Sequence, residues 1–205
     1  AVLFAVKKQG CVPFVNVGYA GFTGSVTGMN LSQVCFGEMG GRGEGLCDGT
    51  PMGILVRMGL ERAKTLADAV RIFKEAKRTC EYYYALSDAK THEAVGIYAT
   101  PDRLDLIRPG LPYPPLLPTP VEHCLLMSGG DRLKALVEKA RAKAGRFDIP
   151  SALALMDRPV AMRSNLHNAL FVPAQFALYV AHARGTAPAC KEPYVRYDVR
   201  ELLAR

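Results

Sequence analysis

The sequence predicts an α+β protein in which helices cover the faces of antiparallel sheets. Two blocks of helical periodicity alternate with short segments of strand-like periodicity, which is the pattern of this class. The third observation is a glycine-rich stretch, residues 18–41, which reads GYAGFTGSVTGMNLSQVCFGEMGG. Each glycine would cost a helix about 1 kcal/mol, so this stretch is predicted to form buried sheet where backbones or a ligand approach closely.

Size and charge place the chain among ordinary globular proteins. It has 205 residues, of which 49% are hydrophobic and 22% charged, and we expect a single domain over residues 1–205. The net charge is +7, but the densest basic group, Arg132–Arg146, is interleaved with acids on one helical pattern. A solvated helix face is therefore expected there, with no nucleic acid as partner. No run reaches the roughly 18 apolar residues of a membrane span, so no membrane partner is expected.

The first half of the chain is predicted to alternate strands and helices. The expected strands cover residues 2–6, 12–17, 22–27 and 34–36, followed by a flexible glycine-rich loop over 40–49. Thr50 and Pro51 predict the start of one helix, and Thr65 with Asp68 predicts a capping box for the next. A meander of three strands is expected over residues 80–86, 94–99 and 103–107.

The second half begins with a proline-rich segment, Pro109–Pro120, which predicts an extended crossing. Ser128 is expected to cap a helix, and Pro150 to start a short one. A hairpin is expected from strands at residues 166–172 and 176–183, and the tail is predicted to end as a short helix or a strap.

Six cysteines stand at irregular positions, without a CxxC pair. This spacing predicts reduced, mostly buried thiols and, with no visible signal peptide, favours a cytoplasmic protein. Cys11 follows Gly10, and Gly-Cys is a junction at which some enzymes cleave themselves to expose a nucleophile. A buried thiol at a strand edge is the preferred interpretation, because no charged residue stands within the next 25 positions to lower its pKa.

The four histidines are isolated, so neither a metal site nor a cofactor is expected. His167 lies in a polar cluster over residues 164–168 with Asn165, where hydrogen bonding of a turn is preferred over direct catalysis. Arg132 follows a possible anion site at a helix N-terminus. The alternative interpretation is a simple helix cap with Arg132 in a structural ion pair.

Four blocks together resemble the isopenicillin N acyltransferase type of cysteine N-terminal nucleophile (Ntn) hydrolases. They are residues 18–30, 49–70, 82–101 and 164–182. The resemblance implies a four-layered αββα sandwich, incomplete at its N-terminus, that acts on a small-molecule amide or an acyl-CoA-like substrate. It also implies that a precursor cleaves itself before a cysteine, whose thiol attacks the acyl carbon while its own α-amino group acts as base.

The chain departs from the family's pattern at the nucleophile and at an oxyanion element. The nucleophilic cysteine is expected before Ala1, and Glu122-His123-Cys124 stands where the family carries a Thr-Asn-His-like element. Asn30 matches a Met-Asn of the family, and Arg132 resembles an arginine that opens the following helix. The pocket or oxyanion candidates are therefore Asn30, Arg132, Asn165 and His167. A vacant strand position is expected near Gly28 and Asn30.

Three hypotheses follow. The first is an Ntn amidohydrolase or acyltransferase whose chain from Ala1 onward is inactive without its cysteine segment. The second is a non-catalytic binding or scaffold domain that keeps the sandwich, and the third takes Cys11 as the nucleophile. The sequence leaves the acyl group, its acceptor and the oligomeric state open.

Overall fold

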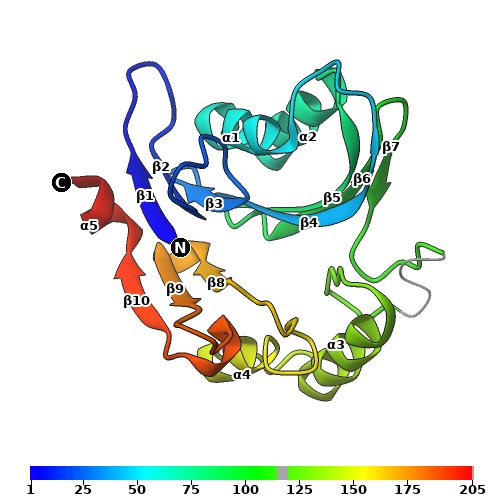
Figure 1. Ribbon diagram of the computed structural model, residues 1–205, viewed down its shortest axis with the longest axis vertical. Coiled ribbons are helices and arrows are strands. Elements are labelled where there is room, and N and C mark those ends of the chain that lie inside the picture. Colours follow the sequence, from blue (N-terminus) through cyan, green and yellow to red (C-terminus); the bar gives the residue numbers. More distant parts are fainter. Residues whose placement is uncertain (115–119, 205) are drawn as a thin grey trace.

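The computed structural model describes residues 1–114 and 120–204, which form two antiparallel sheets (Figure 1). The seven-stranded sheet has its strands in chain order: β1 (Val2–Val6), β2 (Phe14–Gly18), β3 (Thr27–Asn30), β4 (Val34–Gly45), β5 (Cys80–Asp88), β6 (Glu93–Ala99) and β7 (Leu104–Ile107). The three-stranded sheet has the order β10-β9-β8: β8 (His167–Val172), β9 (Ala177–His182) and β10 (Val195–Asp198). The helices are α1 (Met52–Arg62), α2 (Leu66–Glu75), α3 (Gly130–Lys143), α4 (Ile149–Ala154) and α5 (Val199–Ala204), with short 3₁₀ turns η1 (Pro173–Gln175) and η2 (Ala189–Lys191).

Both faces of the large sheet are buried, each by different elements. The side chains of β2, which point alternately to the two faces, show this. Phe14 packs among the side chains of α1 and α2, whereas Val15 and Val17 pack against the small sheet. Figure 1 shows α1 and α2 on one side of the large sheet, with β8, β9, α3 and α4 on the other. This is the arrangement of an αββα sandwich, the fold class that the sequence predicts.

Local signals predicted several elements correctly. β1 has the predicted bounds, and the meander of β5, β6 and β7 is confirmed. The capping box of α2 is also confirmed: Asp68 N donates to Thr65 Oγ1 at 3.1 Å, and Thr65 N donates to Asp68 Oδ2 at 3.1 Å. The hairpin of β8 and β9 turns through η1, where Phe176 adopts the left-handed conformation.

The predicted strand over residues 22–27 is wrong, because the third strand is β3, Thr27–Asn30. The preceding residues form a loop that packs on the start of α1 instead. Ser25 N donates to the carbonyl oxygen of Gly53 at 2.8 Å, and a Cβ at Gly24 would lie 2.7 Å from the carbonyl carbon of Gly53. The glycines there permit contact between a loop and a helix, which β-periodicity does not distinguish from strand pairing.

The predicted flexible loop over residues 40–49 is wrong as far as Gly45, because β4 continues to that residue. It pairs with β5 as far as Gly45 and Cys80, with a register shift after Gly40. A Cβ at Gly41 would lie 2.3 Å from the carbonyl oxygen of Glu81, so a glycine is required by the neighbouring strand. Composition alone indicated a flexible loop, whereas in the structure the glycines allow the two strands to pack closely.

Two smaller expectations also change. The N-cap of α3 is Gly129, not Ser128, and no side chain caps that helix. The expected vacant strand position beside Gly28 and Asn30 is wrong, since β3 pairs with β2 on one side and with β4 on the other. Part of the proline-rich crossing, residues 115–119, lies outside the described residues.

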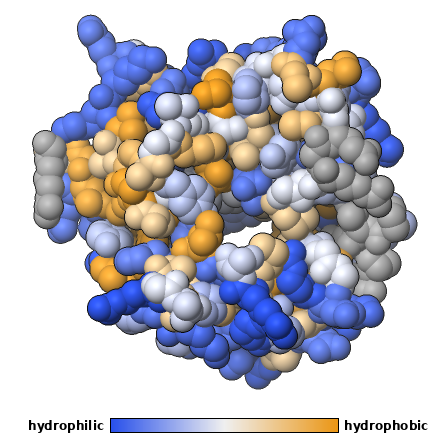
Figure 2. All heavy atoms as spheres, viewed as in Figure 1, coloured by the Kyte–Doolittle hydropathy of each residue, from blue (hydrophilic) through white to orange (hydrophobic). Residues whose placement is uncertain are grey.

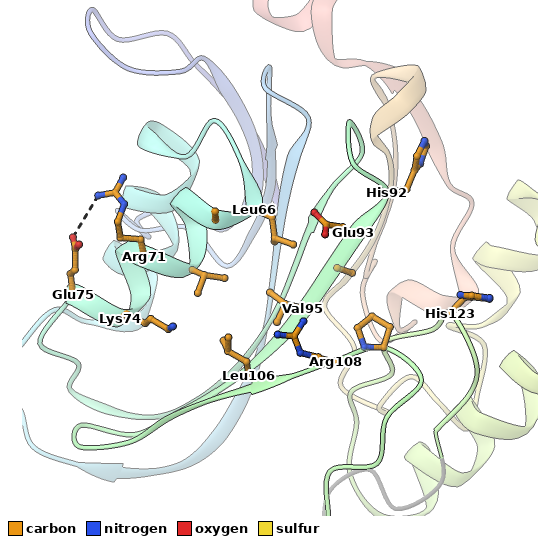
Figure 3. A pocket seen from close by; sticks show the side chains of 14 residues that line it. Leu66, Arg71, Lys74, Glu75, His92, Glu93, Val95, Leu106, Arg108 and His123 are labelled. Atoms are coloured by element: carbon orange, nitrogen blue, oxygen red, sulfur yellow. Dashed lines mark ion pairs between the residues drawn. The ribbon is translucent and has the colours of Figure 1, made fainter.

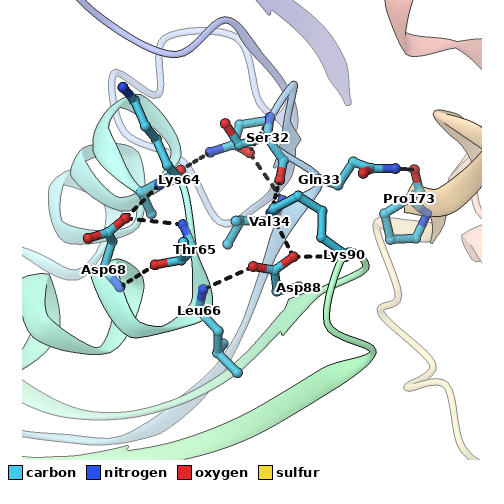
Figure 4. Close-up of polar contacts among 12 residues, drawn as sticks. Ser32, Gln33, Val34, Lys64, Thr65, Leu66, Asp68, Asp88, Lys90 and Pro173 are labelled. Carbon is cyan, nitrogen blue, oxygen red and sulfur yellow. Dashed lines mark hydrogen bonds and ion pairs between the residues drawn. The ribbon is translucent and has the colours of Figure 1, made fainter.

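A polar network joins the start of α2 to the turns of the large sheet and to the small sheet (Figure 4). Buried Asp88 accepts hydrogen bonds from Leu66 N at 3.2 Å and from Lys90 Nζ at 2.7 Å. From the β3–β4 turn, Gln33 Nε2 donates to the carbonyl oxygen of Pro173 at 2.9 Å. These bonds hold the two sheets in a defined relation at one end of the space between them.

We expect Gly28→Ala to destabilise the protein. The added Cβ would lie 2.6 Å from the carbonyl oxygen of Val15 and 2.8 Å from Leu60 Cδ1, so backbone must move. Overpacking of this kind costs about 1–3 kcal/mol in the free energy of unfolding, measurable by chemical denaturation. Gly40→Ala in the neighbouring β4 is the matched control, because nothing lies within 4 Å of its added Cβ. Equal stability of the two variants would contradict the packing argument.

Candidate functional site

Two cavities lie between the large sheet and the elements below it. The smaller has a volume of about 330 Å³ and the larger about 560 Å³, and both are lined by Thr27, Glu38 and Met156. Figure 2 shows the molecule hollowed near its centre, between its upper and lower halves. The smaller cavity contains three of the four side chains that the sequence proposed for a pocket: Arg132, Asn165 and His167.

The most specific contact in the smaller cavity joins Tyr19 and His167. Tyr19 follows β2 and His167 begins β8, so the contact connects the two sheets. The Tyr19 hydroxyl lies 2.7 Å from His167 Nδ1, and the rings meet edge to face with centroids 5.4 Å apart. The sequence placed these residues 148 positions apart, and only the packing of one sheet on the other brings them together.

Burial changes the titration of both groups. It lowers the pKa of His167. It raises the pKa of the Tyr19 hydroxyl, with the charge of Glu38 as a second cause. Near neutral pH the pair therefore consists of a neutral imidazole and a protonated phenol.

Glu38 places a carboxyl group between the two cavities. Burial raises its pKa, and its Oε2 atom is buried without a hydrogen-bond partner among the described residues. Glu38 is the only charged residue from Val12 to Gly41, a signal in the sequence that could have identified it. Neither Glu38 nor Tyr19 was among the predicted site residues.

Arg132 reaches the smaller cavity from the first turn of α3. It is half-buried and makes no hydrogen bond or ion pair within residues 1–114 and 120–204. The ion pair of that first turn joins Asp131 to Lys134 instead, at 3.0 Å. The guanidinium is thus a cation beside a cavity of mixed polar and apolar lining, available to an anionic ligand or to developing negative charge.

Asn165 holds a loop, although it also lines the cavity. Its Nδ2 donates to the carbonyl oxygen of His167 at 2.9 Å, and its Oδ1 accepts from Cys190 N at 3.0 Å. The predicted hydrogen bonding of a turn is confirmed for this residue. These bonds position the backbone of His167 at the cavity.

Asn30 lies away from both cavities, fully buried where β3 ends. Its Nδ2 donates to the carbonyl oxygens of Leu60 at 3.1 Å and Ala63 at 2.7 Å. Its Oδ1 accepts from Ser32 N and Val34 N, both at 3.1 Å. Its amide is therefore fully used in joining the end of α1 to the β3–β4 turn.

None of the described cysteines combines a place at the smaller cavity with an activating environment. Cys35 lines the larger cavity, but burial raises its pKa to about 12, so its thiol stays protonated. Burial also raises the pKa of Cys124. Cys11 lies in the β1–β2 connection, with its Sγ atom 4.0 Å from Glu61 Oε2, and lines neither cavity.

The described residues contain no group of three or more histidines, cysteines or acids placed to hold a metal ion. Among the helices described, none has the length and apolar character to cross a membrane.

The sequence model of the family described as acyl-coenzyme A:6-aminopenicillanic acid acyl-transferase matches residues 3–108. A search among curated protein sequences found no match.

Solved structures show the fold. A variant of the conjugated bile acid hydrolase from Clostridium perfringens is 10% identical, with a TM-score of 0.64, over 94% of this chain and 79% of the other. Penicillin V acylase from Agrobacterium tumefaciens is 11% identical, with a TM-score of 0.62, over 93% and 70%. An N-acylethanolamine-hydrolyzing acid amidase ortholog from Caenorhabditis elegans is 13% identical, with a TM-score of 0.54, over 95% and 86%. The layers and sheets are thus those of the Ntn-hydrolase fold.

We expect Asn30→Ala to lower the free energy of unfolding by about 3 kcal/mol, because two carbonyl oxygens and two amide groups lose their partner in a buried place. Gln33→Ala is the comparison, since it removes a side-chain amide with a single bond, to Pro173. Its expected cost is about 1 kcal/mol. Chemical denaturation measures both, and an Asn30→Ala protein as stable as the wild type would show that its four bonds contribute little.

His167 should make stability depend on pH. Its pKa is lowered by folding, so below its ordinary value of 6.5 the unfolded chain binds a proton that the folded protein does not. The contribution of His167 to the free energy of unfolding is therefore fully present above that value, and it is lost as the pH drops toward the folded pKa. His167→Gln should lose less stability than the wild type between about pH 7.5 and about pH 5. His182→Gln, at the exposed cross-strand neighbour, is the control and should leave the wild-type loss unchanged.

Proposed function

The chain belongs to the acyl-coenzyme A:6-aminopenicillanic acid acyl-transferase family, and on that premise we propose that it cleaves or transfers an acyl group held in an amide or thioester. The substrate is a small molecule that binds in the cavity beside Tyr19 and His167. The single observation that carries this proposal is the convergence of four polar side chains from separate elements at one cavity: Tyr19, Glu38, Arg132 and His167.

The nucleophile is a cysteine thiol at the N-terminus of the mature protein, on residues that precede Ala1 in the natural polypeptide. Family membership supports this assignment, as does the raised pKa of Cys35, the described thiol that lines the larger cavity.

The reaction then has two steps. The thiol sulfur attacks the carbonyl carbon, its proton passes to the α-amino group of the same cysteine, and an oxyanion forms on the carbonyl oxygen. Collapse of this intermediate breaks the bond to the amine or thiol, which leaves with the proton. Water or an amine next attacks the acyl-cysteine, releases the acyl group as an acid or a new amide, and restores the thiol.

Tyr19 and His167 can supply a donor to this oxyanion. In the tautomer in which the phenol donates to Nδ1 of the neutral imidazole, the remaining ring proton sits on Nε2. Asn165 holds the backbone of His167, and Tyr19 holds the ring. An N–H fixed in this way stabilises developing charge without reorganisation.

Arg132 is assigned to the negative charge that develops or arrives at the cavity. The cation comes from α3 and has no ion-pair partner in the described parts of the chain, so its charge remains available. Glu38 lines the same cavity, where burial raises the pKa of its carboxyl group and so disfavours its charged form.

A non-catalytic binding domain is the alternative, and kinetics on the natural full-length polypeptide separates the two. Acyl 4-nitroanilides and acyl thioesters serve as substrates. Arg132→Gln should lower kcat/KM by about 100-fold, the cost of removing one oxyanion donor, while Tyr19→Phe should lower it by about tenfold. Arg196→Gln, which removes an exposed guanidinium on β10, is the matched control and should match the wild type.

Intact-mass spectrometry and iodoacetamide labelling complete the test. An N-terminal cysteine that reacts faster than the other thiols near neutral pH is expected. A full-length protein with neither turnover nor a fast-reacting thiol would overturn the enzyme proposal and favour the binding domain. A mature protein that begins at Cys11 would instead support that residue as the nucleophile.

A further inference from the structure

A third and larger cavity lies outside the proposed catalytic site, on the face of the large sheet that carries the helices (Figure 3). Its volume is about 1060 Å³, and it runs between α2 and the end of the sheet formed by β6 and β7. None of its lining residues belongs to the cavities between the sheets. We refer to it as the α2–β7 groove.

The floor of the groove is apolar for reasons that follow from local geometry. Leu66 and Val70 stand one helical turn apart on α2 and turn the same side toward the sheet. Val95 of β6 and Leu106 of β7 belong to the face of the sheet that packs against this helix. Because α1 and α2 cover the earlier strands, this part of the sheet face is left open.

Two cations flank this floor from different elements. Lys74 extends the stripe of α2 by one more turn, and Arg108 follows Leu106 by two positions, on the same face of the sheet. Figure 3 shows Lys74 and Arg108 on either side of Leu106. Neither makes a hydrogen bond or ion pair with any residue of the described ranges, 1–114 and 120–204.

The other charges of the groove leave these two cations uncompensated. Arg71 pairs with Glu75 at 3.7 Å and with Asp68 at 3.2 Å. Figure 3 shows Glu93 near Leu66, at the end of the groove away from Lys74. The groove thus offers an apolar strip flanked by two cations, while Glu75, the acid next to Lys74 in sequence, pairs with Arg71.

We propose that the α2–β7 groove binds an amphiphile with one anionic head and an aliphatic tail, of which a medium-chain carboxylate is the simplest form. The carboxylate lies between Lys74 and Arg108, and the tail covers Leu66, Val70 and Val95. The charge of the two cations selects the anionic head, and burial of apolar surface holds the tail. Nothing in this site requires the catalytic cavity to be occupied.

Decanoate, titrated below its micelle concentration into the full chain and followed by calorimetry, tests the proposal. Lys74→Ala with Arg108→Ala should weaken binding about fivefold to tenfold, the effect of losing two exposed ion pairs. The matched control, Lys7→Ala with Arg196→Ala, removes two exposed cations elsewhere and should bind as the wild type does. Ala67→Trp, at an exposed position that lines the groove, should block the tail without removing a charge.

A decanoate that carries a terminal diazirine locates the site. Cross-links on peptides of α2, β6 and β7 are expected. Cross-links on β8 and α4 that persist in the Lys74→Ala, Arg108→Ala protein would place the ligand between the sheets and overturn the proposal. Equal binding of decyltrimethylammonium, or no binding of decanoate, would overturn it as well, since the groove is proposed to select an anion. Circular dichroism of each variant confirms that it is folded.

Discussion

The four hydrogen bonds of the Asn30 amide are the constraint on which the large sheet depends. They join the last turn of α1, through Leu60 and Ala63, to the turn that carries the chain from β3 into β4. An unsatisfied donor or acceptor of a buried amide costs free energy, so these four bonds favour one separation between helix and turn. That separation sets how α1 lies on the sheet and leaves the opposite face free for the second sheet.

Close backbone contact provides the rest of the order around this amide. Gly28 lies against the backbone of Val15 and the side chain of Leu60, and Gly24 lies against Gly53. The glycine-rich stretch is therefore the place where strand, loop and helix come nearest to each other. The candidate site lies just outside this packed region, where the chain leaves β2 at Tyr19 and meets β8 at His167. A rigid sheet behind Tyr19 is what allows one hydroxyl to orient a histidine from the other sheet.

The candidate site could be predicted only in part. Arg132, Asn165 and His167 were found because a helix start and a polar cluster before a strand are visible in one dimension. The resemblance to a family also pointed to Asn30, which the structure places in the polar core at the end of α1. Tyr19 was missed because nothing around it in the sequence shows that its hydroxyl will form a hydrogen bond with a histidine 148 positions away. Glu38 was visible as a lone charge in an apolar run, yet its place between two cavities depends on the elements that pack against β4.

The sequence by itself determined the α+β class, the bounds of β1, the meander of β5, β6 and β7, and the capping box at Thr65, because these depend on periodicity and on neighbours within a few residues. Only the tertiary structure decided that residues 22–26 form a loop on α1 and that β4 runs on to Gly45. A glycine permits a turn, a bulge or a close contact equally well, and which one it makes depends on the backbone that packs against it. The same holds for the site, whose members come from elements that meet only when the two sheets pack face to face.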